Sequence, residues 1–159
     1  MRVGTGYDSH VFDDAPKPLV LGGVRIDCAP GLRAHSDGDA LAHAVIDALF
    51  GAAAMGDIGS HFPDTDARWR GADSMKLLAA ASAELRAAGY AVSNVDATVV
   101  CERPKLRAHV EAMRARLADA MGIDVSRVSV KGKTNEGMDA VGAGRGVAVH
   151  AVALIEERA

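Results

Sequence analysis

The chain has 159 residues, enough for one domain, and 49 % of them are apolar, so a substantial core is expected. The formal net charge is −3 and Lys and Arg form no long run, which argues against nucleic acid or an anionic membrane as a partner. The sequence shows no export signal and no apolar run of membrane-spanning length, and Cys28 and Cys101 have no paired spacing. We therefore expect a single cytoplasmic domain over residues 1–159.

Short or alternating apolar runs predict the strands. Residues 2–10 form the first strand. "KPLVLGGVRID" (17–27) places two apolar runs around Gly22-Gly23, which is typical of a hairpin with a two-residue turn. Three further strands are expected at 94–102, 127–133 and 146–157.

Apolar residues at helical spacing predict three helices. The first begins near Asp39, where Ser36 or Asp37 can cap it. The second covers about 16 residues and ends at Gly89, and the third starts near Leu106 and is stopped by Gly122. Strands joined by both hairpins and helices indicate an α+β fold, a mixed β-sheet with helices packed on one face.

A long segment, residues 55–73, separates the first two helices. Segments of this length inside a compact domain are usually functional or disordered. Its acidic residues Asp57, Asp64 and Asp66 lie among glycines and a proline. They indicate either a solvated acidic turn or a mobile flap whose carboxylates hold substrate hydroxyl groups or a divalent cation.

The stretch "GTGYDSH" (4–10) carries the first candidate ligands. Asp8 and His10 are two residues apart, so their side chains leave an extended strand on the same face. They are half of a metal site, or a polar strand end that faces solvent. The third candidate is His43, on the first predicted helix.

His43 has Asp39 and Asp47 four residues to either side on the same helical row, where they could orient its ring. With Asp8 and His10 it would make a set of two histidines and one carboxylate with a fourth position open, as in catalytic zinc sites. The alternative is a histidine satisfied within the core, because sequence does not give the distance between strand and helix.

Two further segments suit phosphate. His35 is expected just before the start of the first helix, beside Ser36, where backbone N–H groups and the helix dipole favour an anion, although a plain capping box is the alternative. In "KGKTNEG" (131–137), Lys133 and Thr134 can hold a phosphate, and Glu136 beside them suggests a bridging cation such as Mg²⁺. The glycines of 142–146 precede a strand, so they match neither a phosphate loop nor a dinucleotide fingerprint.

The motifs "GYDSH", "AHSDGDALAHAVIDALFGAAAMGDIGSHFPDTD", "GADS", "NVDATVV", "RPKL" and "KTNEG" occur in this order along the chain. Over essentially its whole length the chain closely resembles the 2-C-methyl-D-erythritol 2,4-cyclodiphosphate synthase family of the non-mevalonate isoprenoid pathway. The resemblance implies a homotrimer whose sheets surround a threefold axis, with active sites between subunits. It also implies a cytidine diphosphate substrate whose 2-phosphate attacks the β-phosphorus, so that CMP leaves.

The resemblance further implies residue roles. Asp8, His10 and His43 match the zinc ligands, Glu136 matches the ligand of a second cation (Mg²⁺ or Mn²⁺), and His35 and Thr134 match the pair that orients the phosphates. The residues that match the family's substrate-binding segments are Asp8, Ser9, His10, His35, Ser36, Asp57, Ile58, Gly59, Phe62, Pro63, Asp64, Thr65, Asp66, Cys101, Glu102, Arg103, Pro104, Lys105, Leu106, Arg107, Lys133, Thr134, Asn135 and Glu136.

One segment departs from the family pattern. In "MDAVGAGRGV" (138–147), Ala143 stands where an arginine is usual, Ala140 where a bulky residue is usual, and Arg145 where an acid is usual. In the family these positions border the centre of the trimer, where isoprenoid diphosphates can bind. The departure puts such a ligand in doubt, unless Arg145 compensates for the missing arginine.

Two other functions agree with parts of the sequence. A zinc-dependent phosphohydrolase would use the open coordination position for water, although no extra base lies beside the three ligands. A non-catalytic trimeric binder of isoprenoid diphosphates would keep zinc for structure, although the catalytic segments are intact.

Overall fold

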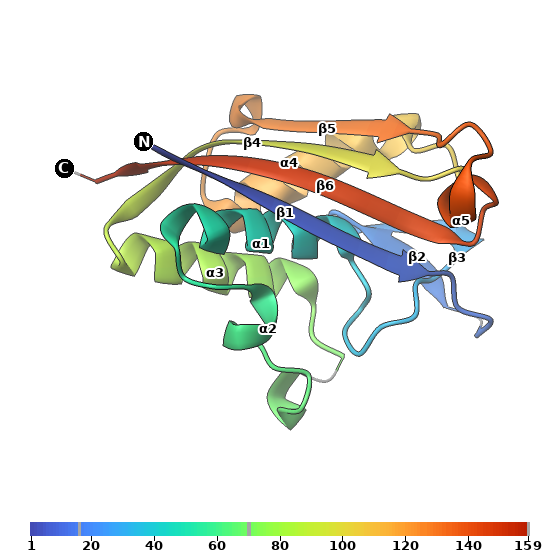
Figure 1. Ribbon diagram of the computed structural model, residues 1–159, viewed down its shortest axis with the longest axis horizontal. Coiled ribbons are helices and arrows are strands. Elements are labelled where there is room, and N and C mark those ends of the chain that lie inside the picture. Colours follow the sequence, from blue (N-terminus) through green and yellow to red (C-terminus); the bar gives the residue numbers. More distant parts are fainter. Residues whose placement is uncertain (16, 70, 159) are drawn as a thin grey trace.

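The computed structural model describes residues 1–15, 17–69 and 71–158, apart from the side chain of Cys28 (Figure 1). A four-stranded sheet forms one layer, and the long helices form a second layer on one of its faces (Figure 1). A separate two-stranded hairpin lies at one end. The α+β class and the mixed sheet with helices on one face are therefore confirmed.

The main sheet has the strand order β1-β6-β4-β5. β6 runs antiparallel to both β1 and β4, whereas β5 runs parallel to β4. β2 and β3 form the predicted hairpin, with Gly22 and Gly23 at positive φ in its turn. The bounds are β1 Arg2–Val11, β2 Pro18–Leu21, β3 Val24–Pro30, β4 Tyr90–Val100, β5 Val128–Lys133 and β6 Gly146–Glu157.

The three predicted helices are present as α1 Ala40–Ala53, α3 Ser74–Ala87 and α4 Val110–Met121. The segment 55–73 is not a plain loop, because it contains α2 (Ile58–His61) and a 3₁₀ turn (Ala67–Trp69). A short helix, α5 (Asp139–Gly142), was not predicted. Within the described residues, no helix combines the length and the apolar character needed to span a bilayer.

Helix α1 lies directly on strand β1, and two glycines of that strand make this possible. A Cβ carbon on Gly4 would overlap the carbonyl oxygen of Ala48, and one on Gly6 would overlap that of Ala44. Since these are backbone atoms in the middle of a helix, they cannot move aside. Glycine at both positions therefore lets strand and helix approach each other through their backbones.

Asp39 caps helix α1. The prediction that Ser36 or Asp37 would be the cap is wrong. The Asp39 side chain accepts the backbone N–H of Ala42, and it also accepts the N–H groups of Gly22 and Gly23 from the hairpin turn, at 2.8 and 2.6 Å. Asp39 is fully buried, and burial raises the pKa of its carboxyl against the opposing effect of these donors. One side chain thus joins the start of α1 to the hairpin.

The other face of the main sheet carries no helix in the described part of the chain. Val3, Tyr7, Val11 and Val152 are exposed there by 64, 56, 52 and 43 %. The Tyr7 ring lies against that of His150 on β6, with a centroid distance of 4.9 Å. These apolar side chains make a face suited to burial against another surface.

We predict that Asp39→Ala lowers the free energy of unfolding by about 3 kcal/mol, since it removes a helix cap and leaves the buried Gly22 N–H and the half-buried Gly23 N–H of the hairpin turn unpaired. Asp73→Ala is the matched control, because Asp73 caps α3 by accepting only from Met75. It should cost about 1 kcal/mol. Urea unfolding measures both values, and equal losses in the two variants would contradict the structural role assigned to Asp39.

Candidate active site

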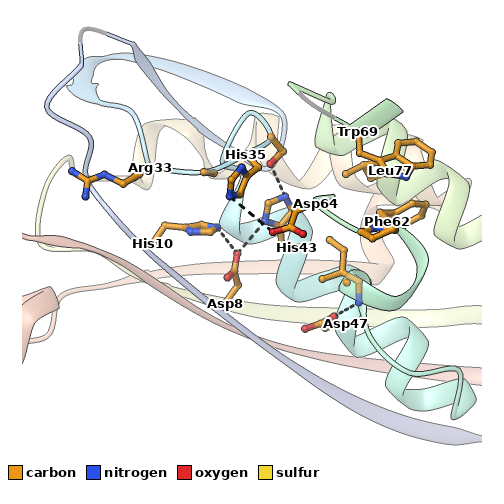
Figure 2. A pocket seen from close by; sticks show the side chains of 15 residues that line it. Asp8, His10, Arg33, His35, His43, Asp47, Phe62, Asp64, Trp69 and Leu77 are labelled. Atoms are coloured by element: carbon orange, nitrogen blue, oxygen red, sulfur yellow. Dashed lines mark hydrogen bonds and ion pairs between the residues drawn. The ribbon is translucent and has the colours of Figure 1, made fainter. Parts of the chain in front are cut away.

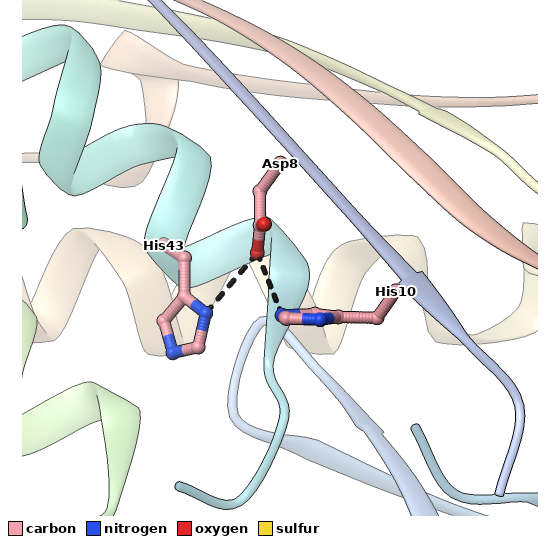
Figure 3. A group of neighbouring side chains, drawn as sticks. All are labelled: Asp8, His10 and His43. Atoms are coloured by element: carbon pink, nitrogen blue, oxygen red, sulfur yellow. Dashed lines mark hydrogen bonds and ion pairs between the residues drawn. The ribbon is translucent and has the colours of Figure 1, made fainter. Parts of the chain in front are cut away.

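Asp8, His10 and His43 meet at one point between β1 and α1 (Figure 3). Asp8 Oδ2 lies 3.0 Å from His10 Nε2 and 3.1 Å from His43 Nδ1. One ligand atom from each residue lies within 4.8 Å of the other two. Tetrahedral zinc, with bonds near 2.1 Å, spaces its ligands by roughly 3.4 Å, so the cluster suits a single divalent ion.

The ring nitrogen of His10 supports this reading. His10 Nε2 is buried, and among the described residues no group meets it in hydrogen-bond geometry, although Asp8 lies close by. A buried polar atom without a partner is costly, and a metal ion would satisfy it. The two imidazole rings are nearly perpendicular, with 80° between their planes, so each presents an edge to the shared point.

The electrostatics of the cluster favour a bound cation. Burial raises the pKa of the Asp8 carboxyl, but His10 and His43 outweigh burial and hold that pKa well below its ordinary value. Burial lowers the pKa of His43, but the Asp8 carboxylate outweighs burial and leaves that pKa above its usual value. Asp8 is therefore ionised at neutral pH, and a cation that binds here competes with protons for His43.

The prediction that Asp39 and Asp47 orient the His43 ring is wrong. Asp39 is used as the helix cap, and Asp47 Oδ1 accepts the backbone N–H of Ile58 at 2.8 Å. The ring instead meets two hydroxyl groups: His43 Nε2 lies 2.9 Å from Ser74 Oγ and 3.3 Å from Ser36 Oγ. Helical spacing pointed to carboxylates on the same helix, whereas Ser74 comes from the start of another one.

The cluster opens into a cleft of about 780 Å³ (Figure 2). Its far end is apolar, because Phe62, Trp69 and Leu77 gather there, and the rings of Phe62 and Trp69 meet edge to face with centroids 5.1 Å apart. Asp8, His10 and His43 lie at the other end, so the cleft joins a polar end to a largely apolar one. The predicted residues that line it are Asp8, His10, His35, Ser36, His43, Ile58, Gly59, Phe62, Pro63 and Asp64.

Helix α2 forms part of the cleft wall and is held to the body of the protein. The His61 ring stacks on Phe50 of α1 at 3.9 Å and contacts Glu84 Oε2 on α3 at 2.7 Å. Asp57 caps α2 by accepting from Ser60, and Asp66 accepts from Arg68. These two carboxylates, which were predicted to face substrate, therefore have local partners, as does neighbouring Asp64, which lies 3.9 Å from His35.

His35 and Ser36 precede α1 and lie outside its first turn. Helix α1 begins at Ala40, and the N–H of Ala42 in its first turn donates to the Asp39 side chain, so this donor is already used. Both residues still line the cleft. Ser9 lies between Asp8 and His10 on β1, so its side chain leaves the strand on the other face.

The second group of predicted residues lies at the opposite edge of the sheet. Cys101 follows β4 and its backbone N–H donates to the carbonyl oxygen of Lys133 at 2.8 Å, while Leu106 packs on Gly132. Burial raises the pKa of the Cys101 thiol to about 11, so it is a neutral thiol. Cys101, Pro104, Lys105, Leu106, Arg107, Lys133 and Thr134 line a separate hollow of about 330 Å³.

The register of the sheet shows how far apart the two groups are. Asp8 pairs with Val149 of β6, Val149 pairs with Val99 of β4, and Val99 pairs with Gly132 of β5. Three strand spacings separate the two edges by roughly 14 Å. A single copy of the chain therefore does not bring His35 and Thr134 together.

The loop after β5 has an ordered network of its own. Thr134 Oγ1 donates to Glu136 Oε1 at 2.6 Å, and Asn135 N–H donates to Glu102 Oε2 at 3.2 Å. Glu136 adopts a φ of +50°, a backbone angle that residues other than glycine rarely adopt. Such conformations recur at functional sites, and here the loop presents Thr134 and Glu136 side by side.

A family model described as the YgbB family matches residues 1–156 of the chain. The chain belongs to the YgbB family. A curated relative, the 2-C-methyl-D-erythritol 2,4-cyclodiphosphate synthase of Trichlorobacter lovleyi, is 52 % identical over 155 residues, covering 98 % of both proteins. The family resemblance found in the sequence motifs is therefore confirmed.

Comparison with solved structures agrees with this assignment. The chain matches a 2C-methyl-D-erythritol-2,4-cyclodiphosphate synthase in its CDP-bound form with a TM-score of 0.89 and 39 % identity, covering 98 % of this chain and all of that one. It also matches the bifunctional IspDF from Campylobacter jejuni with a TM-score of 0.94 and 40 % identity. There the match covers 98 % of this chain but 42 % of the longer protein.

Sequence reasoning missed several residues of the cleft. Arg33, Trp69 and Leu77 line it, and Ser74 and Asp37 lie behind His43. The apolar residues carried no signal beyond ordinary core spacing. Ser74 lies in the "GADS" motif, which marked the family without suggesting a role.

Proposed function

We propose that the chain converts 4-diphosphocytidyl-2-C-methyl-D-erythritol 2-phosphate into 2-C-methyl-D-erythritol 2,4-cyclodiphosphate and CMP, a step of the non-mevalonate isoprenoid pathway. The 2-phosphate oxygen forms a bond to the β-phosphorus while the bond from that phosphorus to the CMP oxygen breaks. The observation that carries the proposal is the Asp8–His10–His43 cluster at the mouth of a cleft, in a chain about half identical to a named synthase over its full length.

We assign zinc to the three residues of the cluster. Two neutral imidazoles and one carboxylate are a usual ligand set for catalytic zinc, and they leave one position open. Zinc held there would act as a Lewis acid that neutralises phosphate charge and lowers the repulsion between the two phosphates. Since the substrate carries its own nucleophile, the protein needs no nucleophilic side chain, and positioning of the two phosphates is its main task.

The remaining residues have supporting roles in the proposal. His35 and Thr134 orient the phosphates, and Glu136 holds a second divalent cation, Mg²⁺ or Mn²⁺. Lys133 contributes a positive charge near the α-phosphate, and the segment 101–107 holds the cytidine. Ser9 and Asn135 are also assigned to substrate binding. The segments Asp57–Gly59 and Phe62–Asp66 surround the methylerythritol, and Ile58, Gly59, Phe62, Pro63 and Asp64 of these segments line the cleft.

We further propose that the active enzyme is a homotrimer. The metal cluster and the proposed cytidine segment lie at opposite edges of one sheet, so one copy does not place both on the same substrate. A neighbouring copy that presents its β5 edge to the β1 edge of the first completes the site. The exposed apolar face with Val3, Tyr7 and Val152 supplies a surface for packing the sheets around a threefold axis.

An isoprenoid diphosphate at the centre of that trimer is not part of the proposal. Ala140 and Ala143 replace the bulky residue and the arginine that are usual in the family. Arg145 is exposed, and its backbone carbonyl accepts from the N–H of Phe12. Its guanidinium is the cation nearest to Ala140 and Ala143 along the chain.

The first prediction concerns the product. The purified protein with zinc, Mg²⁺ and the authentic substrate should release CMP and a cyclic diphosphate, seen as two coupled phosphorus resonances without inorganic phosphate. Release of inorganic phosphate or of a linear diphosphate would assign the phosphohydrolase activity instead. Absence of turnover with bound isoprenoid diphosphate would assign the non-catalytic binder.

The second prediction concerns the metal. His43→Ala should lose the bound zinc and the turnover while its circular dichroism stays that of the parent protein, because one of three ligands is gone. In the parent protein, zinc affinity should fall as the pH falls through the raised pKa of His43, since protons then compete for the ring nitrogen. His109→Ala, at the start of α4, is the control and should keep about one zinc per chain. Undiminished zinc in His43→Ala would refute the ligand assignment.

The third prediction concerns assembly. Val152→Asp places a charge on the uncovered face of the sheet and should convert the trimer into monomers with little turnover, because a buried unpaired carboxylate costs several kcal/mol. Val125→Asp is the matched control, since Val125 is exposed by 42 % but lies before β5, off that face. Sedimentation velocity measures both. A monomeric parent protein, or an unchanged Val152→Asp trimer, would contradict the proposed interface.

A further inference from the structure

Ser74 lies directly behind the metal cluster, outside the predicted binding segments. It is the first residue of α3 and is fully buried. Its hydroxyl oxygen lies 2.9 Å from His43 Nε2, and His43 Nδ1 is the nitrogen next to Asp8. Ser74 therefore contacts the ring nitrogen that the metal cluster does not use.

Asp37 holds the Ser74 hydroxyl in place. The Ser74 hydroxyl donates to Asp37 Oδ1, and the Ser74 backbone N–H donates to Asp37 Oδ2 at 2.9 Å. The backbone N–H of Asp39 also donates to Asp37 Oδ1, at 3.2 Å. Since three donors fix the carboxylate, its position relative to Ser74 is well determined.

The hydrogen bonds in this chain have one consistent direction. A serine hydroxyl has a single proton, and a carboxylate can only accept. Because the Ser74 proton goes to Asp37, the Ser74 oxygen must accept a proton from His43 Nε2. The neutral His43 ring is thus held as the tautomer with Nε2–H, and its lone pair on Nδ1 points to the cluster with Asp8.

Ser36 is the other hydroxyl near the ring, but its contact is weaker. It lies 3.3 Å from His43 Nε2, and its own contact in the described residues is acceptance of the Gly38 N–H at 3.2 Å. Unlike Ser74, it has no carboxylate among the described residues that takes its proton. Its hydroxyl is free to turn toward the cleft.

We propose that Ser74 and Asp37 are positioning residues that fix the tautomer and the orientation of His43 as a metal ligand. Metal-bound imidazoles usually donate their other N–H to an acceptor, and loss of that acceptor weakens metal binding by about 10- to 100-fold. The inference rests on the proposed metal site, and it assigns to two residues from different segments the role that Asp39 and Asp47 do not fill.

Zinc affinity and the ring protonation of His43 test this proposal. In Ser74→Ala, competition with a chromophoric chelator should show zinc binding weaker by about 10- to 100-fold. In nitrogen-15 spectra of the zinc-loaded parent protein, His43 should carry its proton on Nε2, and in the variant this proton should exchange faster with water. Ser82→Ala is the matched control, because Ser82 lies on the same helix, is 1 % exposed, and its hydroxyl donates to the Leu78 carbonyl.

A second variant separates positioning from stability. Asp37→Asn keeps the size of the side chain but replaces a carboxylate that accepts three donors with an amide, so it should weaken zinc binding in the same direction while Ser74 is still present. Parent-like zinc affinity in both Ser74→Ala and Asp37→Asn, with thermal stability lowered as in Ser82→Ala, would overturn the proposal. If the parent protein itself binds no zinc, the proposed metal site is wrong, and this result is distinct from failure of the variants alone.

Discussion

The candidate site depends on the backbone contact between β1 and α1. On the inner face of β1, Gly4 and Gly6 have no side chain, and α1 lies against them. The same face continues with Asp8 and His10, where the strand passes the first turns of the helix and meets His43. A side chain on either glycine would push the helix away from the strand, and the three ligand atoms would separate. Strand alternation thus places the space for the helix and the two strand ligands on one face.

Much of the fold followed from the sequence because its signals are local. The alternation at 94–102, the Gly22-Gly23 turn and the apolar helical spacing after Asp39 each act over a few residues, and the structure confirms these elements. Asp8, His10 and His43 could be proposed as a set because strand and helix geometry orients each of them. To predict that these three side chains meet, one must also know that Gly4 and Gly6 let the strand and the helix touch.

The parts that sequence reasoning missed are contacts between distant segments. Helical spacing placed Asp39 beside His43, but its carboxylate accepts the N–H groups of Gly22 and Gly23, 17 and 16 residues earlier in the hairpin turn. Ser74 meets His43 across 31 positions, and no periodic pattern signals that pairing. Likewise the separation of the two proposed halves of the site follows from the strand order, which local patterns do not determine.

The buried carboxylate of Asp39 has a mechanical consequence. It links the turn of the β2–β3 hairpin to the first turn of α1, and His43 lies four residues after Asp39 on this helix. A displacement of the hairpin turn therefore acts directly on the start of the helix. The hairpin thus helps to hold the His43 ring in position at the cluster with Asp8 and His10, through Asp39 and the helix rather than by direct contact.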